Sequence, residues 1–489
     1  MKKKLLAVSV AATLGFGAGV ANAQVAVAEN GVGQVNILPY YSVQSGNATL
    51  VHITNTDTVN GKAVKVRFRG AEWSDDVFDF QVFLSPGDIF TGAVEYNGNT
   101  GLAKFSTSDN SCTLPANVNR DFVDQRLHNK ATGTLEGYVE VLTLADIPEN
   151  TAADSLYTTI KHVDGVAPCD FDILKVLVQD TGTELFQGLT VPTGSLLTFG
   201  TIINVPESKA FTVAATAVDY VAANKIFFRQ ANERVTTPTW FTDLTADDIF
   251  NVIPLYAFDL PDLTTPVVGV TPTEQRDLYA DALAKNGVAV EYVGDPDLSA
   301  TTDVVFSQPV RRFFYDFVTP GGSAGRYEIA PGVFAGIYGT GKYAGLVGSE
   351  NRIGVGSATF WDREENTVVS ETDIVISPTP PSAELTYSLK GEVSIISINN
   401  GEVPTGSLAA ELTANNYDSG LESQDGWATL SLTNRSNGEA LPVIGYSAIN
   451  LRNTSIGAAG TNYGNVLPLR GYAAPAGDLE PVEPEPAPE

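Results

Sequence analysis

The feature that most constrains the fold of this chain is a strict alternation of apolar and basic residues in Val64-Lys65-Val66-Arg67-Phe68-Arg69. Successive side chains of a β-strand point to opposite faces of a sheet, so the apolar residues share one face and the three cations share the other. The alternation returns from Phe78 to Leu84, and Ser85-Pro86-Gly87-Asp88 then has the composition of a turn. Residues 46–94 therefore predict a half-buried antiparallel sheet that forms one face of a β-sandwich.

Similar strand patterns recur along the rest of the chain. They cover residues 137–142, 173–178, 194–205, 211–218, 288–293, 303–306, 312–317, 392–398 and 427–434. One helix is predicted over Glu274–Asn286, because Thr273 can cap its start and Gly287 follows its end. The predicted fold class is mainly β, with an immunoglobulin-like β-sandwich at the N-terminus, an elaborated β-rich middle and a smaller C-terminal β region.

Composition divides the chain into five predicted parts. These are a signal peptide (1–23), a β-sandwich domain with inserted loops and a disulfide (24–220), a β-rich region with one helix (221–377), a C-terminal β region (378–474) and a disordered Pro/Glu tail (475–489). The segment Gly426–Asn434 echoes Gly46–Asn55, and a second apolar strand follows each. Two related sandwich modules and two hairpins that obey the same rules both explain this echo.

The N-terminus predicts export. Met1-Lys2-Lys3-Lys4 is a basic start, Leu5–Val20 is a short apolar run, and Ala21-Asn22-Ala23 has the small residues of a cleavage site. A membrane anchor is the alternative, but the run is short for a span and glycines interrupt it. We expect a mature chain that starts at Gln24, has no membrane span and is extracellular or on the cell surface, with the periplasm as the alternative.

The charge balance narrows the expected partners. The chain has 57 acidic and 29 basic residues, which gives a formal net charge of −28. Such a charge repels nucleic acids and anionic lipids, and it favours solubility and divalent cations. The scarcity of Met and Cys suits an oxidising exterior. The expected associations are self-assembly and contacts with other cell-surface components.

The two cysteines, Cys112 and Cys169, predict one disulfide. In an exported protein such a bond, closing a loop of this length, stabilises the fold by roughly 4 kcal/mol. A metal site is the alternative. Its nearest histidine, His162, lies at a poor ligand spacing before Cys169, and His52 and His128 are scattered.

Two glycine-rich motifs resemble those of enzymes. Residues Gly321–Gly325 fit the nucleophile pattern of serine hydrolases, but that pattern needs a following helix and a later histidine, and no His follows His162. We interpret the segment as a glycine turn. Residues 336–343 approach a phosphate-binding loop, with Tyr343 in place of the hydroxyl residue that holds magnesium. No catalytic or cofactor-binding residue is predicted.

Acidic and aromatic residues supply the remaining candidates. Carboxylates next to tryptophans are weak candidates for the catalytic acids of a glycosidase. Acidic loops suit calcium. Exposed tryptophans can stack on sugar rings, although tryptophans are more often part of a core. The acids are Glu72, Asp362, Glu364 and Glu365, the loops are Asp109–Asn110 and Asp295–Asp297, and the tryptophans are Trp73, Trp240, Trp361 and Trp427.

Several phrases of the sequence resemble a family of uncharacterised exported surface proteins of proteobacteria. They are Val64–Arg69, Asp79-Phe80 with Leu84–Asp88, Glu136–Val141, His162–Val166, Thr302–Phe306 and Asp362–Glu365. The chain departs from the family at Ser307–Phe313, where a Phe-Pro-Thr-Lys-Arg-Phe type of run is expected. The resemblance implies export and a continuous fold over about residues 34–370, and it implies no activity.

Together these features predict an exported, non-enzymatic structural protein of the cell surface or extracellular space, as part of a surface layer, filament or matrix. The alternative is an exported protein that binds carbohydrate or acts on glycosides. A periplasmic scaffold for another exported protein is a third class.

Overall fold

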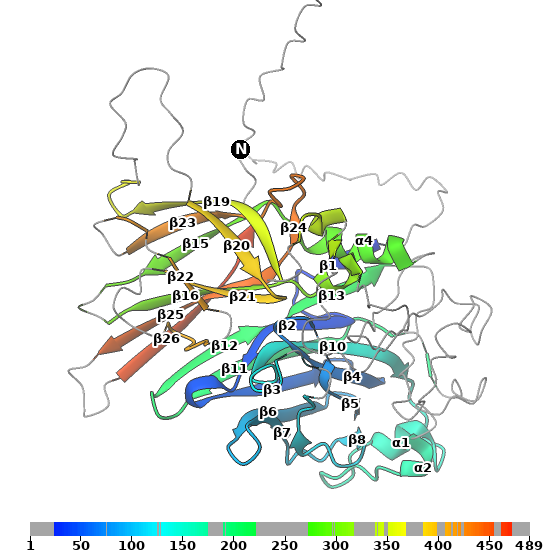
Figure 1. Ribbon diagram of the computed structural model, residues 1–489. Coiled ribbons are helices and arrows are strands. Elements are labelled where there is room, and N and C mark those ends of the chain that lie inside the picture. Colours follow the sequence, from blue (N-terminus) through cyan, green and yellow to red (C-terminus); the bar gives the residue numbers. More distant parts are fainter. Residues whose placement is uncertain are drawn as a thin grey trace, which may run out of the picture.

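The computed structural model shows a mainly β protein built from stacked sheets, which confirms the predicted fold class (Figure 1). The structure describes residues 24–221 and 272–471, apart from 75, 125–126, 128, 175–188, 191, 296, 298, 317–337, 340, 347–350, 368–384, 399–405, 412–413, 418, 422–424 and 454–460. The predicted signal peptide and Pro/Glu tail lie outside the described residues.

Two antiparallel sheets form the N-terminal sandwich. The first, called the β4 sheet, has the order β1 (Gln24–Val27), β13 (Thr216–Val221), β2 (Val35–Ser42), β10 (Glu136–Ile147), β4 (Gly61–Gly70), β5 (Asp76–Leu84), β8 (Cys112–Leu114). The second, called the β3 sheet, has the order β12 (Lys209–Ala214), β11 (Leu196–Asn204), β3 (Asn47–Asn55), β6 (Ile89–Asn97), β7 (Leu102–Ser106), β9 (Arg120–Asp121). The rings of Phe68 and Phe80 lie 5.6 Å and 5.1 Å from the ring of Phe105, so the apolar face of β4 packs on the β3 sheet. The immunoglobulin-like part of the prediction is not confirmed.

Two further sheets form the C-terminal sandwich. The β23 sheet has the order β20 (Leu385–Lys390), β19 (Arg352–Asp362), β23 (Asp425–Ser431), β15 (Gly287–Val293), β27 (Arg470–Gly471). The β16 sheet has the order β22 (Ala414–Tyr417), β21 (Val393–Ile398), β16 (Thr301–Ser307), β25 (Ile444–Asn453), β26 (Thr461–Pro468). The pair β21–β22 is parallel, whereas the other pairs in these two sheets are antiparallel. Strands from 221–377 and from 378–474 thus share the same sheets, and the boundary predicted at residue 378 does not separate two packing units.

Short elements complete the described chain. They are α1 (Leu156–Ile160), α2 (Phe171–Leu174), α4 (Pro272–Leu283), η1 (Gln44–Gly46), η5 (Arg311–Phe314), η6 (Gly341–Tyr343), and the two-stranded ladders β14 (Ala284–Lys285) with β24 (Leu441–Pro442) and β17 (Tyr315–Asp316) with β18 (Tyr338–Gly339). The predicted helix is confirmed as α4, but it begins at Pro272, so Thr273 lies inside the helix and is not its N-cap. It ends before Asn286, because Ala284 and Lys285 pair with β24 instead.

Three strand predictions are wrong in part. Residues 173–174 belong to α2, since Asp170 accepts hydrogen bonds from the backbone N–H groups that follow it and starts a turn. Residues 211–218 form two strands rather than one, because the N–H of Ala215 donates to Thr198 O on β11 between β12 and β13. Residues 312–314 belong to the 3-10 helix η5.

The two sandwiches meet across a continuous hydrophobic core. One cluster of buried residues runs through both of them, and β2 lies beside β16 at the junction. Every residue of β2 and of β16 is buried, so neither strand has a face in solvent. Figure 1 shows the β23 sheet at the upper left, the β16 sheet below it on the left, and β3 to β8 of the N-terminal sandwich at the bottom of the view.

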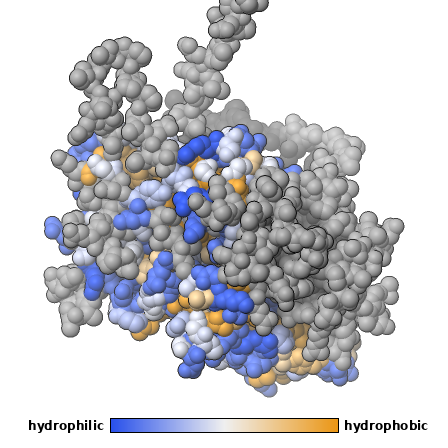
Figure 2. Space-filling view, in the orientation of Figure 1, coloured by the Kyte–Doolittle hydropathy of each residue, from blue (hydrophilic) through white to orange (hydrophobic). Residues whose placement is uncertain are grey.

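Hydrophilic residues cover much of the coloured surface, with small scattered apolar areas between them (Figure 2). Among the helices that the structure describes, none is long and apolar enough to cross a bilayer.

Candidate functional site

The cations of β4 do not face solvent. All three are 2% exposed or less, so the prediction of a half-buried strand is wrong at these positions. Acidic side chains of the neighbouring strands explain how the burial is tolerated, since a buried charge needs a close counter-charge. The pairs are Lys65 Nζ with Asp79 Oδ1 at 2.6 Å, Arg67 Nε with Asp76 Oδ2 at 3.2 Å and Arg69 Nε with Glu140 Oε2 at 2.5 Å. We call these six residues the ionic network; its formal charges cancel.

Lys62, at the start of β4, is held by two carboxylates. Its Nζ lies 2.6 Å from Asp146 Oδ1 and 3.3 Å from Asp57 Oδ2. Burial alone raises the pKa of Asp57, but hydrogen bonds from Asn60 and Val59 and the charge of Lys62 outweigh it and lower the pKa to about 2. These groups fix the β3–β4 turn to β10, which is a structural role.

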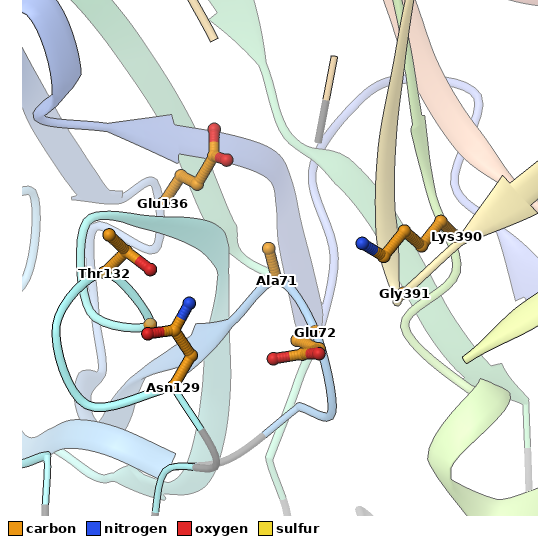
Figure 3. Close-up of a pocket in the computed structure, with 8 residues that line it drawn as sticks. Ala71, Glu72, Asn129, Thr132, Glu136, Lys390 and Gly391 are labelled. Atoms are coloured by element: carbon orange, nitrogen blue, oxygen red, sulfur yellow. The ribbon is translucent and has the colours of Figure 1, made fainter. Parts of the chain in front are cut away.

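A cavity of about 160 Å³ lies at the junction of the two sandwiches (Figure 3). The end of β4, the loop before β10 and the β20–β21 turn form its wall, and Figure 3 shows the Lys390 side chain extending from β20 toward Ala71. The lining residues are Ala71, Glu72, Asn129, Thr132, Gly133, Glu136, Lys390 and Gly391. With two carboxylates and one ammonium group, the cavity suits water or a small polar molecule.

Two of the groups that line this cavity are held by hydrogen bonds, one within the N-terminal sandwich and one across the junction. Tyr40 donates its hydroxyl to Glu136 Oε2 at 2.6 Å, and burial, with the Glu136 carboxylate beside it, raises the pKa of Tyr40. The Nδ2 of Asn351 donates to the backbone oxygen of Glu72. The candidate acid Glu72 lies in the same cavity wall as Glu136. No pattern in the sequence predicts that Lys390 joins them, because it is on a different sandwich.

A second candidate site lies on the outer face of the β23 sheet. Trp361 on β19 and Trp427 on β23 are directly opposite each other, and their rings stack with centroids 4.2 Å apart at an interplanar angle of 11°. The Trp427 side chain is 42% exposed. Glu291 on β15 is the neighbour of Trp427 on the other side and is exposed. We call these three residues the Trp ledge.

The other tryptophans do not extend this surface. Trp73 is 3% exposed and belongs to the core, whereas Trp240 lies outside the described residues. The strand period places Trp361 and Trp427 on outward positions, but their pairing across β19 and β23 has no signal in the sequence.

Cys112 and Cys169 form a disulfide, which confirms the prediction. The bond ties the edge strand β8 to the segment between α1 and α2. His162 is close to this region but pairs with Asp88, at 3.6 Å between Nδ1 and Oδ2. Burial raises the pKa of Asp88, and the nearby His162 opposes that rise.

The remaining acidic candidates cap their own loops. Asp109 accepts hydrogen bonds from the N–H groups of Thr91 and Ser111. Asp362 accepts from the Asn366 amide and from the backbone of Asn366 and Glu364, and these bonds lower its pKa. Asp297 is exposed, as are Glu364 and Glu365. Within residues 24–221 and 272–471 as described, no group of three or more His, Cys, Asp or Glu side chains is placed to share a metal ion such as calcium.

The two enzyme-like motifs are described only in part. The segment Gly321–Gly325 and His128 lie outside the described residues. In the second motif, residues 341–343 form η6, and the Tyr343 ring is buried with the guanidinium carbon of Arg311 5.8 Å from its centroid. Tyr343 therefore acts as a packing residue.

The resemblance to exported proteobacterial proteins stays a prediction, because no protein-family model, no curated protein and no solved structure matches this chain.

Proposed function

We propose that this chain is exported and has a non-enzymatic, structural role at the cell surface or in the extracellular space, in a surface layer, filament or matrix. The observation that carries the proposal is the hydrophobic core shared by the two sandwiches. Domains that move on each other meet through smaller and more polar interfaces, whereas a shared core joins them as one body.

Backbone hydrogen bonds reinforce the junction on the side of the β20–β21 turn. The N–H groups of Glu392 and Val393 donate to Ala71 O at 2.8 Å and 3.1 Å. Gly391 makes this approach feasible, because a Cβ at that position would lie 2.5 Å from the same oxygen. The turn is thereby locked onto the end of β4.

Further contacts lie at a distance from that turn. Asn47 Nδ2 donates to Leu408 O at 2.8 Å, and Ser45 Oγ donates to Glu411 Oε1 at 2.6 Å. The edge strand β12 lies beside β26. An interface held at several separate places resists hinge bending, and a rigid body of this kind suits a structural component.

Composition supports the location. The predicted leader directs export, the disulfide suits an oxidising compartment, and the net charge of −28 keeps such a surface soluble. As partners we propose other surface components or further copies, and neither nucleic acid nor a membrane span.

The test is to locate the native protein in its source cells. Antibody detection after fractionation should place it in the surface or extracellular fraction, and electron microscopy of sheared surface material should show it there. A variant that lacks residues 2–23 is the matched control and should stay in the cytosol. Washing the cells with a calcium chelator tests whether calcium anchors the protein. Native protein found in the cytosol, or purely periplasmic and absent from sheared material, would contradict the proposal.

A further inference from the structure

The outer face of the β23 sheet carries a stacked pair of tryptophans. Along β15 and β23 most inward residues are apolar and buried. The outward residues are Ala289, Glu291 and Val293 on β15, and Asp425, Trp427, Thr429 and Ser431 on β23. The next row across the sheet consists of Thr359, Thr429 and Ala289, which are half-buried. One aromatic row therefore lies among smaller outward side chains on this face.

The Trp427 side chain is 42% exposed although Trp361 stacks on one face of its indole, which is consistent with an open second face. Trp361 covers one face of Trp427 from the side of β19. The second face of Trp427 is therefore turned toward β15, where Glu291 is its cross-strand neighbour. An apolar ring face next to a carboxylate is thus held ready without rearrangement, because the stack already fixes the indole.

Polar groups surround this open face. Arg363 Nη2 pairs with Asp425 Oδ2 at 3.0 Å at the end of the same strands, and Arg363 is 68% exposed. On β27, Arg470 is exposed and pairs with Ala289 in the register of the sheet. The ledge is consequently bordered by hydrogen-bond acceptors and donors of both charges.

We propose that the Trp ledge binds a neutral oligosaccharide, with one pyranose ring stacked on Trp427 and its hydroxyl groups donating to Glu291. A pyranose has an apolar C–H face and a rim of hydroxyls, which matches an indole face bordered by polar side chains. An acidic glycan would have to overcome the net charge of −28, whereas a neutral oligosaccharide would not. A quaternary ammonium ligand is less suited, because it prefers rings arranged as a cage around it rather than stacked in parallel.

The experiment is titration calorimetry of the full chain with cellohexaose, xylohexaose, mannohexaose and maltohexaose, and with choline as a cationic probe. At least one hexasaccharide should bind saturably. Trp427→Ala should weaken that binding about tenfold or more, because aromatic anchors contribute most of the affinity at such surfaces. Trp427→Phe keeps an aromatic ring and should retain part of the affinity.

Tyr463→Ala is the matched control. Tyr463 is 56% exposed on β26, on another sheet, so its loss should leave binding unchanged. Circular dichroism checks that each variant is folded. The proposal is overturned if none of the hexasaccharides binds, if Trp427→Ala binds them as the native chain does, or if choline alone binds and Glu291→Gln abolishes it. Oligosaccharide binding by the Trp ledge is independent of the proposed structural role, because each of these binding results can occur wherever the protein is located.

Discussion

The outer faces of the β4 sheet and the β23 sheet make an instructive comparison. Both sheets contain alternating strands with an apolar inner face. On the β4 sheet the outward residues are Lys65, Arg67 and Arg69, and all three are buried. On the β23 sheet the outward residues include Trp427, which is 42% exposed. Charge is inside and an aromatic ring is outside, the reverse of what hydropathy alone suggests.

The difference lies in what surrounds each face. Charges on β4 tolerate burial because each has an acidic neighbour, and the pairs keep the face neutral. The Trp ledge tolerates exposure because the two rings cover part of each other's surface. Burial in this protein therefore depends on the partners of a side chain as much as on its polarity. Five predictions test the comparison.

The largest effect is expected from the disulfide, which only the N-terminal sandwich has, since the chain contains two cysteines. Replacing Cys112 and Cys169 together by Ser should destabilise that sandwich by about 4 kcal/mol, because the unfolded chain regains the entropy of a long loop. Urea unfolding of the native and variant chains measures this. Equal stability of the two would show that the loop is already constrained without the bond.

Arg69→Ala should cost about 3 kcal/mol, because it leaves the Glu140 carboxylate buried without its closest counter-charge. The matched control is Arg363→Ala, which removes the exposed ion pair with Asp425 on the β23 sheet. It should lower the free energy of unfolding by less than about 0.5 kcal/mol. Unfolding at low and at high salt separates the two, since salt screens only the exposed pair. Similar costs at both positions would break the comparison.

Gly391→Ala should destabilise the junction by about 2 kcal/mol, because this residue has a φ of +69° and its Cβ would press on Ala71 O. Gly438→Ala is the control: its φ is +77°, but nothing lies within 4 Å of the added Cβ. The difference between the unfolding free energies of the two variants measures the cost of the contact between the added Cβ at position 391 and Ala71 O. If the two variants are equally stable, the turn is not locked onto β4.

Trp427→Ala should cost only about 1 kcal/mol, the contribution of an aromatic pair at a surface. Trp73→Ala, in the core, should cost about 4 kcal/mol by the same measurement, because it leaves a large cavity. A large loss at position 427 would mean that the ring serves the fold rather than a surface.

The last prediction concerns pH. The pKa of Asp57 is lowered from 3.8 to about 2 in the folded chain, so its carboxylate stabilises the fold above about pH 4. That contribution is lost as the pH falls from about 4 toward 2. Asp57→Asn should therefore lose less stability than the native chain over this interval, as measured by urea unfolding at several pH values. Parallel curves for the two proteins would contradict the pKa shift.

Much of the secondary structure was predictable, because strand alternation is local. The strands β4, β10, β11 and β15 follow from their own residues, as does the helix α4. Two predictions were wrong in part. The strand predicted from residue 173 is replaced there by α2, because Asp170 starts a turn, and the predicted helix ends early, because Ala284 pairs with β24. Neither contact can be read from a local strand or helix pattern. The candidate sites were less predictable. Glu72 and Trp427 were among the predicted candidates. Glu136 and Lys390 were not, because they belong to different sandwiches and line one cavity only where the two sandwiches meet.

The residue pattern alone predicts a β protein with alternating strands, an acidic composition, one disulfide and a leader-like start. Which face of each strand is covered depends on how the strands pack in three dimensions. Alternation is local and sorts side chains onto two faces, whereas contacts with segments distant in the sequence determine which face is covered. The cations of β4 are buried beside acidic partners on β5 and β10, and the ring of Trp427 is exposed.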